Sequence, residues 1–289
     1  MIREVRAKTL LSHKKHPDPW FGIKYTMNVY RGCQHGCIYC DTRSECYGID
    51  DLNTISVKVN AVERLRDELP RKRVRGIIGT GSMNDPYMPV ERIYDLTGQA
   101  LAVIAEHGYP LHLMTKSDLV LKDLDTLVDI ARVGANVSFT VTTADDDLAA
   151  KVEPRAPAPS RRFRAMETLA ACGVDVGISM MPILPHIEDT LQNVTEIVTR
   201  GHDHGARYAI PWFGMTLRDR QRDHYYAELD RLWPGLRAKY ERRYGQRYEC
   251  TSPRAERLEG AFTDLVARWD MATRVRPYLE DAPQQLALL

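Results

Sequence analysis

The stretch NVYRGCQHGCIYCDTRSECYG, residues 28–48, contains four of the six cysteines in the chain. Cys33, Cys37 and Cys40 fall within eight residues, with the spacing C-x3-C-x2-C. Gly32 and Gly36 allow the backbone around them to fold tightly. Three thiolates at this spacing can converge on one cluster-sized object. An electron-transfer iron–sulfur cluster normally takes four cysteines, so three would leave one iron with an open coordination position.

Other interpretations of the same cysteines stay open at this point. A zinc site would recruit His35 or Cys46 as a fourth ligand. A ferredoxin-like cluster would use Cys46 as its fourth cysteine. The thiols would also be explained as buried apolar side chains without a metal. Cys172, at the end of a predicted helix, is expected in the core. We favour the three-thiolate cluster, because clustered cysteines in a reducing compartment indicate a metal or catalytic role.

The composition is that of a globular protein. The chain has 289 residues, of which 44% are hydrophobic and 27% charged. A net charge of +1 excludes a polyanion-binding field over the whole molecule, so any nucleic-acid contact needs a local patch. No apolar run reaches the roughly 18 residues of a membrane span, and the first residues lack a signal-peptide pattern. We therefore expect a cytoplasmic protein with no membrane contact; the sequence does not indicate an oligomeric state.

A helix-like segment that ends at a glycine and is followed by an apolar run recurs along the chain. Examples are residues 96–108 before 109–115, and 161–173 before 174–185. Strands are predicted near residues 26, 75, 111, 136, 174 and 206. Strands that alternate with helices indicate an α/β fold with a parallel sheet. Periodicity alone does not distinguish an open doubly wound sheet from a barrel.

The loops that leave the predicted strands are rich in Gly, Pro, Ser, Thr and charged residues, and the cysteine stretch is one of them. In parallel α/β folds the functional site lies at the carboxyl ends of the strands. The repeat stops near residue 217, where a basic and aromatic helical segment begins. We predict a partial (β/α)6 TIM-type barrel over residues 1–216. Residues 217–289 are predicted to form a C-terminal helical extension packed on the barrel.

The cysteine spacing, with Tyr39 before the last cysteine and a series of βα units behind it, resembles the radical S-adenosylmethionine (SAM) superfamily. Residues 8–40, KTLLSHKKHPDPWFGIKYTMNVYRGCQHGCIYC, resemble the spore photoproduct lyase-like subgroup, and the resemblance runs over roughly residues 8 to 250. It implies that Cys33, Cys37 and Cys40 hold a [4Fe–4S] cluster whose fourth iron binds SAM. A one-electron reductant such as a flavodoxin or ferredoxin would then allow cleavage of SAM to a 5′-deoxyadenosyl radical, which abstracts hydrogen from a substrate.

The resemblance also implies which side chains hold SAM: Tyr39, Ser82, Asp85, Lys116, Thr140, Glu153 and Arg162. Ser82 and Asp85 would address the amino group of SAM and Lys116 its methionine carboxylate, while Thr140 would meet the ribose. Each residue also has an ordinary explanation. These are a glycine-rich turn with an Asp cap, a surface lysine, β-propensity, and a solvated ion pair between Glu153 and Arg162.

The substrate is a separate question. In the lyase subgroup a cysteine after the second strand donates hydrogen to the product radical, whereas this chain has Ser82 there, so splitting of a thymine dimer by that route is not expected. A nucleic acid is one predicted substrate class and a small metabolite or peptide the other. A non-enzymatic zinc or iron–sulfur interaction module is a third possibility. Seven residues of the tail would stack bases and neutralise phosphates, or else line a solvated helix: Arg237, Lys239, Tyr240, Arg242, Arg243, Tyr244 and Arg247.

Overall fold

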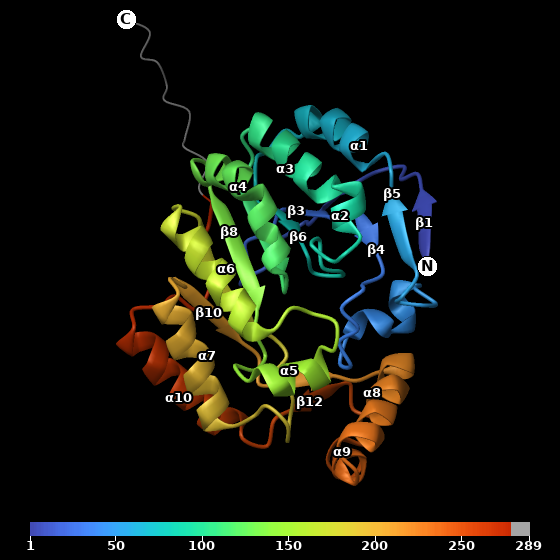
Figure 1. The fold of residues 1–289 in the computed structure, drawn as a ribbon, viewed down its shortest axis with the longest axis vertical. Coiled ribbons are helices and arrows are strands. Elements are labelled where there is room, and N and C mark those ends of the chain that lie inside the picture. The colour runs from blue at the N-terminus through green and yellow to red at the C-terminus, as the bar shows by residue number, and fades with distance from the viewer. Residues whose placement is uncertain (279–289) are drawn as a thin grey trace, which may run out of the picture.

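A seven-stranded sheet forms the centre of the computed structural model, which describes residues 1–278 (Figure 1). Its strand order is β10-β9-β8-β7-β6-β3-β2; six strands run parallel and β2 is antiparallel at one edge. The strands are β2 (Leu11–His13), β3 (Tyr25–Met27), β6 (Ile78–Thr80), β7 (Leu111–Thr115), β8 (Ala135–Thr140), β9 (Asp175–Met180) and β10 (Tyr208–Pro211). The six predicted strand positions and the parallel α/β sheet are therefore confirmed.

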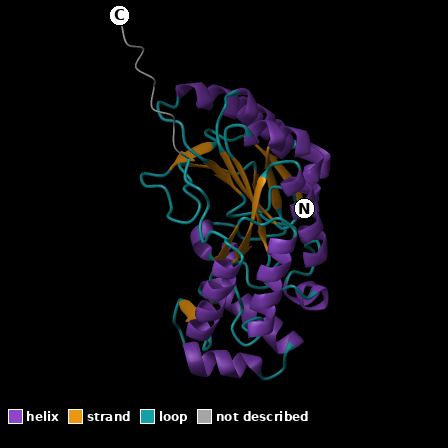
Figure 2. Cartoon of the chain, turned by 90° about the vertical axis from the view of Figure 1, so that its left-hand side faces the viewer, coloured by secondary structure: helices purple, strands orange, loops and turns teal. Residues whose placement is uncertain are grey.

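Helices connect these strands and lie as a layer on one face of the sheet, as Figure 2 shows. The longer ones are α1 (Ala61–Glu68), α3 (Leu96–Glu106), α4 (Leu124–Ala131), α6 (Pro159–Ala171) and α7 (Leu191–Asp203). Shorter helical segments are η1 (Asp41–Arg43), η2 (Glu45–Tyr47), η3 (Leu69–Arg71), α2 (Glu91–Tyr94), η4 (Asp118–Asp123) and α5 (Asp146–Val152). The edge strands β10 and β2 do not pair with each other within residues 1–278, so the sheet is open and not a closed barrel.

The core lies between the sheet and the helices. Every residue of β8 is buried, and β7 and β9 each have one residue that is not. Leu113, Val137 and Ile178 belong to the apolar core. Polar residues alternate with them along the strands and are buried as well, and His112 and Ser138 are hydrogen-bonded to each other at 2.8 Å. Full burial of one such apolar side chain contributes about 1.5–3 kcal/mol. Packing in this core fixes the positions of the strand ends.

The first predicted strand differs from the structure. Residues 25–32 are broken after Met27, and β4 (Tyr30–Arg31) joins a separate three-stranded sheet of order β1-β5-β4 with β1 (Ile2–Val5) and β5 (Ile55–Lys58). The Tyr30 hydroxyl donates to the buried carboxylate of Glu91, a contact between residues far apart in sequence. The chain thus leaves the main sheet just before the cysteines.

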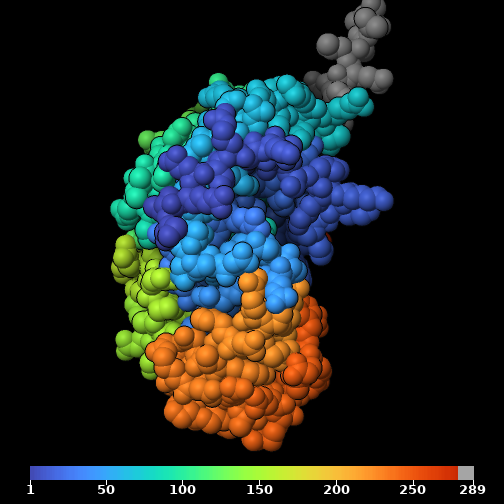
Figure 3. All heavy atoms as spheres, turned by 90° about the vertical axis from the view of Figure 1, so that its right-hand side faces the viewer, coloured from blue at the N-terminus to red at the C-terminus, as the bar shows by residue number. Residues whose placement is uncertain are grey.

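Beyond residue 213 the chain adds both helices and strands. β11 (Gly214–Thr216) pairs antiparallel with β12 (Glu249–Thr251), and between them lie α8 (Asp219–Leu232) and α9 (Leu236–Tyr244). These two helices form the foot of the molecule in Figure 3. α10 (Ala255–Arg268) packs against α7, and Ala272 bridges to Tyr208 at the edge of the main sheet. Residues 279–289 of the predicted extension lie outside the described residues. Within residues 1–278 no helix has the length and apolarity needed to span a membrane.

Candidate active site

One cavity of about 240 Å³ opens at the carboxyl ends of the parallel strands. Its wall comes from the cysteine loop and from the residues that end or follow β6, β7, β8, β9 and β10. Eight of the ten predicted site residues line it: Cys33, Cys37, Tyr39, Cys40, Ser82, Asp85, Lys116 and Thr140. Glu153 and Arg162 lie behind the wall. We call this space the cysteine cavity.

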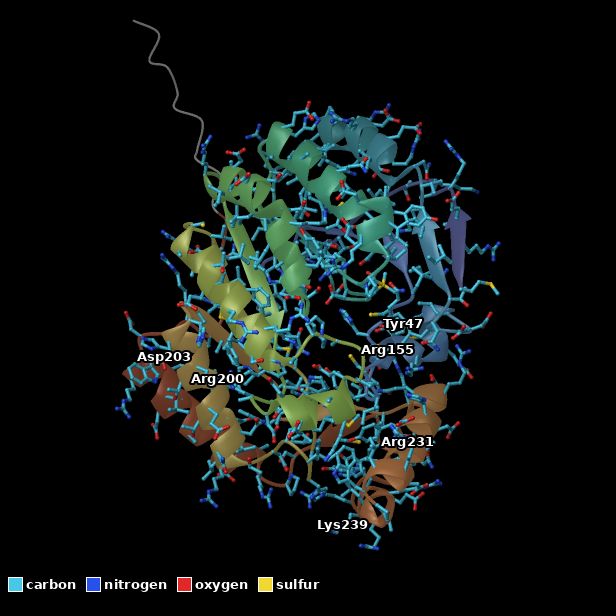
Figure 4. All side chains as sticks on the ribbon, in the orientation of Figure 1. Tyr47, Arg155, Arg200, Asp203, Arg231 and Lys239 are labelled. Atoms are coloured by element: carbon cyan, nitrogen blue, oxygen red, sulfur yellow. The ribbon has the colours of Figure 1, made fainter. Side chains whose placement is uncertain are left out.

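The cysteine loop is tied to the protein by backbone hydrogen bonds on both sides. Cys33 N–H donates to Leu52 at 2.9 Å, and Ile38 N–H donates to Val152 at 3.0 Å. Gly36 has φ of +70°, and a Cβ there would stand 2.7 Å from the guanidinium of Arg155. Figure 4 shows Arg155 beside this loop. A residue other than glycine at position 36 would therefore meet both backbone strain and a clash.

Residues 216–221, at and just before the start of α8, hydrogen-bond to the same loop. The amide of Gln221 donates to the backbone carbonyl of Tyr39 at 3.0 Å. Arg218 pairs with Asp41 at 2.8 Å, and Thr216 also donates to Asp41, at 3.0 Å. On the other side, the Thr42 hydroxyl donates to the carbonyl of Met83, at 3.0 Å, in the loop after β6. Segments far apart in sequence therefore fix where the thiols point.

The three thiols fit an iron–sulfur cluster by their chemistry. All three are free cysteines, with Cys33 and Cys37 buried and Cys40 half-buried, and all three face the cysteine cavity. Burial raises the pKa of the Cys33 thiol to about 11 and raises the pKa of Cys37 as well. Thiolates in such a site need a metal's positive charge nearby. Within residues 1–278, no three His, Cys, Asp or Glu side chains are grouped as ligands of a metal ion.

The other cysteines lie elsewhere. Cys46 is exposed and is not part of the cavity wall, although the zinc and four-cysteine interpretations use it as a ligand. His35, the alternative zinc ligand, lies with Nε2 3.0 Å from a carboxylate oxygen of Asp85. Cys172 caps the end of α6 and is exposed, so its predicted place in the core is wrong. Cys250 is buried in β12.

Asp85 lines the cavity, and both of its carboxylate oxygens have partners within the protein. It accepts hydrogen bonds from the Thr115 hydroxyl at 2.7 Å, the Lys116 N–H at 2.6 Å and the Tyr87 N–H at 2.9 Å, besides the contact with His35. Burial alone would raise the pKa of Asp85, but His35 and these hydrogen bonds outweigh it and lower the pKa to about 2. Asp85 thus joins the ends of β6 and β7 to the cysteine loop.

Glu153 is the centre of a buried charge network under the cavity. Its carboxylate accepts a hydrogen bond from the Tyr39 hydroxyl and pairs with Arg162 at 2.5 Å. Lys116 Nζ lies 3.9 Å from Glu153. The side chains of Glu153 and Arg162 are each 1% exposed, so the pair is not the solvated one that the sequence left open. Burial opposes the charge of Glu153, but Arg162 and Lys116 more than compensate and lower its pKa.

Arg162 also anchors the strand end from which Thr140 faces the cavity. Its Nη1 donates to the carbonyl of Thr140 at 2.9 Å and its Nε to the carbonyl of Pro157 at 2.8 Å. Lys116, the cation of the wall, lies 5.9 Å from the ring centre of Tyr39. Burial lowers the pKa of Lys116, but Cys37 and Glu153 reverse this and raise it, so the side chain is an ammonium. The cavity therefore presents one fixed positive charge next to the thiols.

Sequence reasoning did not find two further groups at this site. Asn84 is buried in the cavity wall, and its amide Nδ2 has no hydrogen-bond partner within the described residues. Asn84 lies in the sequence between Ser82 and Asp85, two predicted site residues, and this position could have indicated it. Glu188 is fully buried and accepts from the Thr142 hydroxyl at 2.8 Å and from Leu184 N–H at 3.0 Å. Burial raises the pKa of Glu188 to about 8, and nothing in the local sequence predicts this.

The rest of the wall mixes polar and apolar side chains. Four methionines line the cavity, Met83, Met114, Met181 and Met215, together with Trp212. Thioether chains fill irregular space around a ligand and keep water out of it. The arrangement places three thiols, one ammonium and a group of apolar side chains on one cavity, which suits a metal cluster with a carboxylate ligand beside it.

Comparison with known proteins agrees with this geometry. The family model described as the radical SAM superfamily matches residues 27–198. An uncharacterized protein of Mycobacterium tuberculosis (strain H37Rv) is 29% identical over 263 residues, which cover 88% of this chain and 77% of that protein. The radical SAM Nalpha-GlyT isomerase of Pseudomonas phage M6 is 26% identical over 216 residues, 70% of this chain and 45% of that protein. A mutant spore photoproduct lyase with bound SAM and dinucleoside spore photoproduct has the same fold, with a TM-score of 0.70 and 15% identity, over 93% of this chain and 78% of that one.

Proposed function

Because the chain belongs to the radical SAM superfamily, we propose that it reductively cleaves SAM in the cysteine cavity and uses the product radical to abstract hydrogen from a bound substrate. Members of this family are enzymes that bind a [4Fe–4S] cluster and SAM. The observation that carries the proposal is that the thiols of Cys33, Cys37 and Cys40 and the ammonium of Lys116 open into one cavity.

When bound, the cluster and SAM supply a one-electron cleavage of the C5′–S bond to methionine and a 5′-deoxyadenosyl radical. The protein contributes position and charge. The three thiols hold the cluster, and Lys116 attracts the methionine carboxylate through a charge-assisted hydrogen bond. Ser82 and Thr140 also line the cavity, where Ser82 would contact the amino group of SAM and Thr140 its ribose. The apolar side chains of the wall exclude water from the reacting atoms.

The remaining predicted contacts act by positioning. Asp85 holds the Lys116 backbone and the loop of Ser82 in place through the hydrogen bonds described above. Glu153 orients Tyr39 and Lys116, and Arg162 keeps Glu153 charged and ties it to the end of β8. We infer that residues 1–216 work as a partial barrel around the cavity and that the residues after 216 form an extension that closes its lower side.

The substrate that we propose is a nucleic acid, modified or repaired at a base. Two things support this class. The structurally similar mutant spore photoproduct lyase has a dinucleoside spore photoproduct bound. The foot of this molecule carries cations that have no carboxylate partner among residues 1–278. A small metabolite or peptide is the alternative. A flavodoxin or ferredoxin in the cytoplasm is the electron donor that we propose, since radical SAM enzymes need a one-electron reductant.

The experiment is anaerobic reconstitution with iron and sulfide, followed by addition of dithionite and SAM. Wild-type protein and the Cys172→Ala control should both yield 5′-deoxyadenosine, because Cys172 is exposed at the end of α6. Cys37→Ala should yield none above background. Equal yields from Cys37→Ala and wild type would overturn the proposal. Deuterium transfer into 5′-deoxyadenosine from labelled oligonucleotides, nucleosides and peptides then identifies the substrate class.

A further inference from the structure

A second hollow, of about 620 Å³, lies at the foot of the molecule. Cationic side chains dominate its wall: Lys239, Arg242, Arg243 and Arg247, with His186 and a single carboxylate, Glu249. We call it the basic pocket. Lys239, Arg242 and Arg243 are spaced i, i+3 and i+4 on α9, which places them on one face of the helix. Figure 4 shows Lys239 projecting from α9 at the lower end of the molecule.

The cations of the basic pocket have no carboxylate partners within residues 1–278, although ion pairs are common on the same helices. Arg237 on α9 pairs with both Asp230 and Glu241, and Arg231 on α8 pairs with Glu228. By contrast, Lys239, Arg242, Arg243 and Arg247 are exposed and form no salt bridge among the described residues. No carboxylate of the described residues neutralises these exposed cations, so they remain available to a polyanion.

His186 adds a second, independent sign of a ligand. Its Nε2 is buried and has no hydrogen-bond partner within the described part of the chain. Burial lowers the pKa of His186, Asp189 raises it, and Arg243, Lys239 and Arg254 lower it further. The imidazole lines the basic pocket together with Lys239 and Arg243. Cations in the last turn of a helix stabilise its dipole, which explains Arg242 and Arg243. That effect does not explain why Lys239, Arg247 and an unpaired imidazole nitrogen share the same hollow.

The basic pocket and the cysteine cavity share a wall. Met215 and Thr216 of β11 line the cysteine cavity, and Glu249 and Thr251 of β12 line the basic pocket. Thr216 is paired directly with Glu249 in the two-stranded sheet. Opposed residues in such a pair have Cα atoms about 5 Å apart. The loop after β9 also reaches both spaces, through Pro182 at the cavity and His186 at the pocket.

From this placement we propose that the basic pocket binds the phosphodiester backbone of the nucleic acid whose base enters the cysteine cavity. This inference rests on the proposed function and gives the substrate a second point of attachment. Guanidinium and ammonium groups bind phosphate oxygens through charge-assisted hydrogen bonds. Aromatic stacking is not part of the proposal. Tyr240 and Tyr244, predicted from sequence to stack bases, are buried and their hydroxyls donate to the backbone, so that prediction is wrong.

The test compares two variants with the same change in charge. One is Lys239→Gln/Arg242→Gln/Arg243→Gln; the control is Arg132→Gln/Arg231→Gln/Arg237→Gln, whose arginines are exposed and paired with carboxylates. Fluorescence anisotropy with reconstituted protein measures binding of labelled single-stranded DNA and RNA of one sequence over a range of salt. Loss of three phosphate contacts should reduce the slope of log affinity against log salt by about 2 and weaken binding about tenfold or more. The two oligonucleotides show which nucleic acid is preferred.

Each outcome decides between the proposals. If the pocket variant and the control bind equally, the basic pocket is not the phosphate site, even when wild type binds DNA or RNA. If wild type binds neither oligonucleotide at low salt, the inference fails. In either case, 5′-deoxyadenosine formed by the pocket variant at the wild-type rate without substrate shows that the radical SAM step itself stands. Loss of that activity in the control as well would identify a folding defect, which circular dichroism of both variants checks.

Discussion

The cysteine cavity and the basic pocket handle charge in opposite ways. Around the cavity, Glu153, Arg162 and Asp85 are buried, Lys116 is half-buried, and each has a partner in the protein. In the pocket, the cations are exposed and have no acidic partners among residues 1–278. Buried charges must be paired to be tolerated, and pairing fixes their geometry. Exposed cations without partners cost little in water and remain available to a ligand. The charges around the cysteine cavity are therefore held in fixed positions, whereas those of the basic pocket are free to bind a ligand.

The largest expected effect is on stability, and it comes from removing one partner of a buried charged pair. Arg162→Met leaves Glu153 buried without its closest charged partner, so the free energy of unfolding should fall by about 3–5 kcal/mol. The matched control is Arg161→Met in the next position, whose pair with Asp118 is half exposed; it should change stability by about 1 kcal/mol or less. Urea unfolding of both variants measures the difference. Similar losses of unfolding free energy in the two variants would mean that the buried pair stabilises the fold no more than the exposed pair does.

The next effect is on SAM binding. Lys116→Met removes the one ammonium in the wall of the cysteine cavity, and a hydrogen bond to a charged group contributes about 1.5–3 kcal/mol, so the apparent KM for SAM should rise about 10- to 100-fold. Lys151→Met in α5 is the control and should leave KM unchanged. Steady-state 5′-deoxyadenosine formation gives both values. An unchanged KM in Lys116→Met would show that the carboxylate of SAM is held elsewhere.

Glu188 is a buried acid that forms no salt bridge among the described residues, so it should make the stability of the protein fall as pH rises. Burial moves the pKa of Glu188 from 4.5 to about 8, so between these values the folded state holds a proton that the unfolded state has lost. Stability should then decrease by about 1.4 kcal/mol per pH unit across that window and level off above it. Glu188→Gln keeps the hydrogen-bonding shape and should flatten the curve. If stability depends on pH in the same way in wild type and Glu188→Gln, the pKa of Glu188 is not raised.

The smallest expected effect is on oligonucleotide binding at the basic pocket. Glu249 is the only carboxylate of its described lining, and a rim charge of the wrong sign weakens attraction to a polyanion. Glu249→Gln should tighten oligonucleotide binding about threefold, and more at low salt than at high salt. Glu256→Gln on the exposed start of α10 is the control. Weaker binding by Glu249→Gln would place the phosphates elsewhere.

Local patterns in the sequence predicted the parts of the molecule that depend on local chemistry. Alternating helical and β-rich segments predicted the six parallel strands, and the cysteine stretch was predicted as a loop that leaves the first of them. The structure places Ser82, Asp85, Lys116 and Thr140 on the same cavity as that loop. The break in the first strand was missed, because β4 is drawn away by its pairing with β5 and by the Tyr30–Glu91 contact.

Burial of polar groups was the other thing that the sequence did not predict. Glu153 and Arg162 read equally well as a surface pair, and Tyr240 and Tyr244 read as an exposed aromatic stripe. Both interpretations changed because α8, α9 and the residues near 152–162 pack against the cysteine loop, through contacts such as Ile38 to Val152 and Gln221 to Tyr39. Such contacts depend on tertiary structure, so no spacing within a segment shows them.

The most direct test of the central claim is metal analysis of Cys46→Ala and Cys37→Ala after anaerobic reconstitution. If the protein holds its cluster by three thiolates, Cys46→Ala should contain about four irons and four sulfides per chain, as wild type does, and Cys37→Ala should lose them. One zinc per chain, or loss of iron from Cys46→Ala, would contradict a three-thiolate cluster with an open iron.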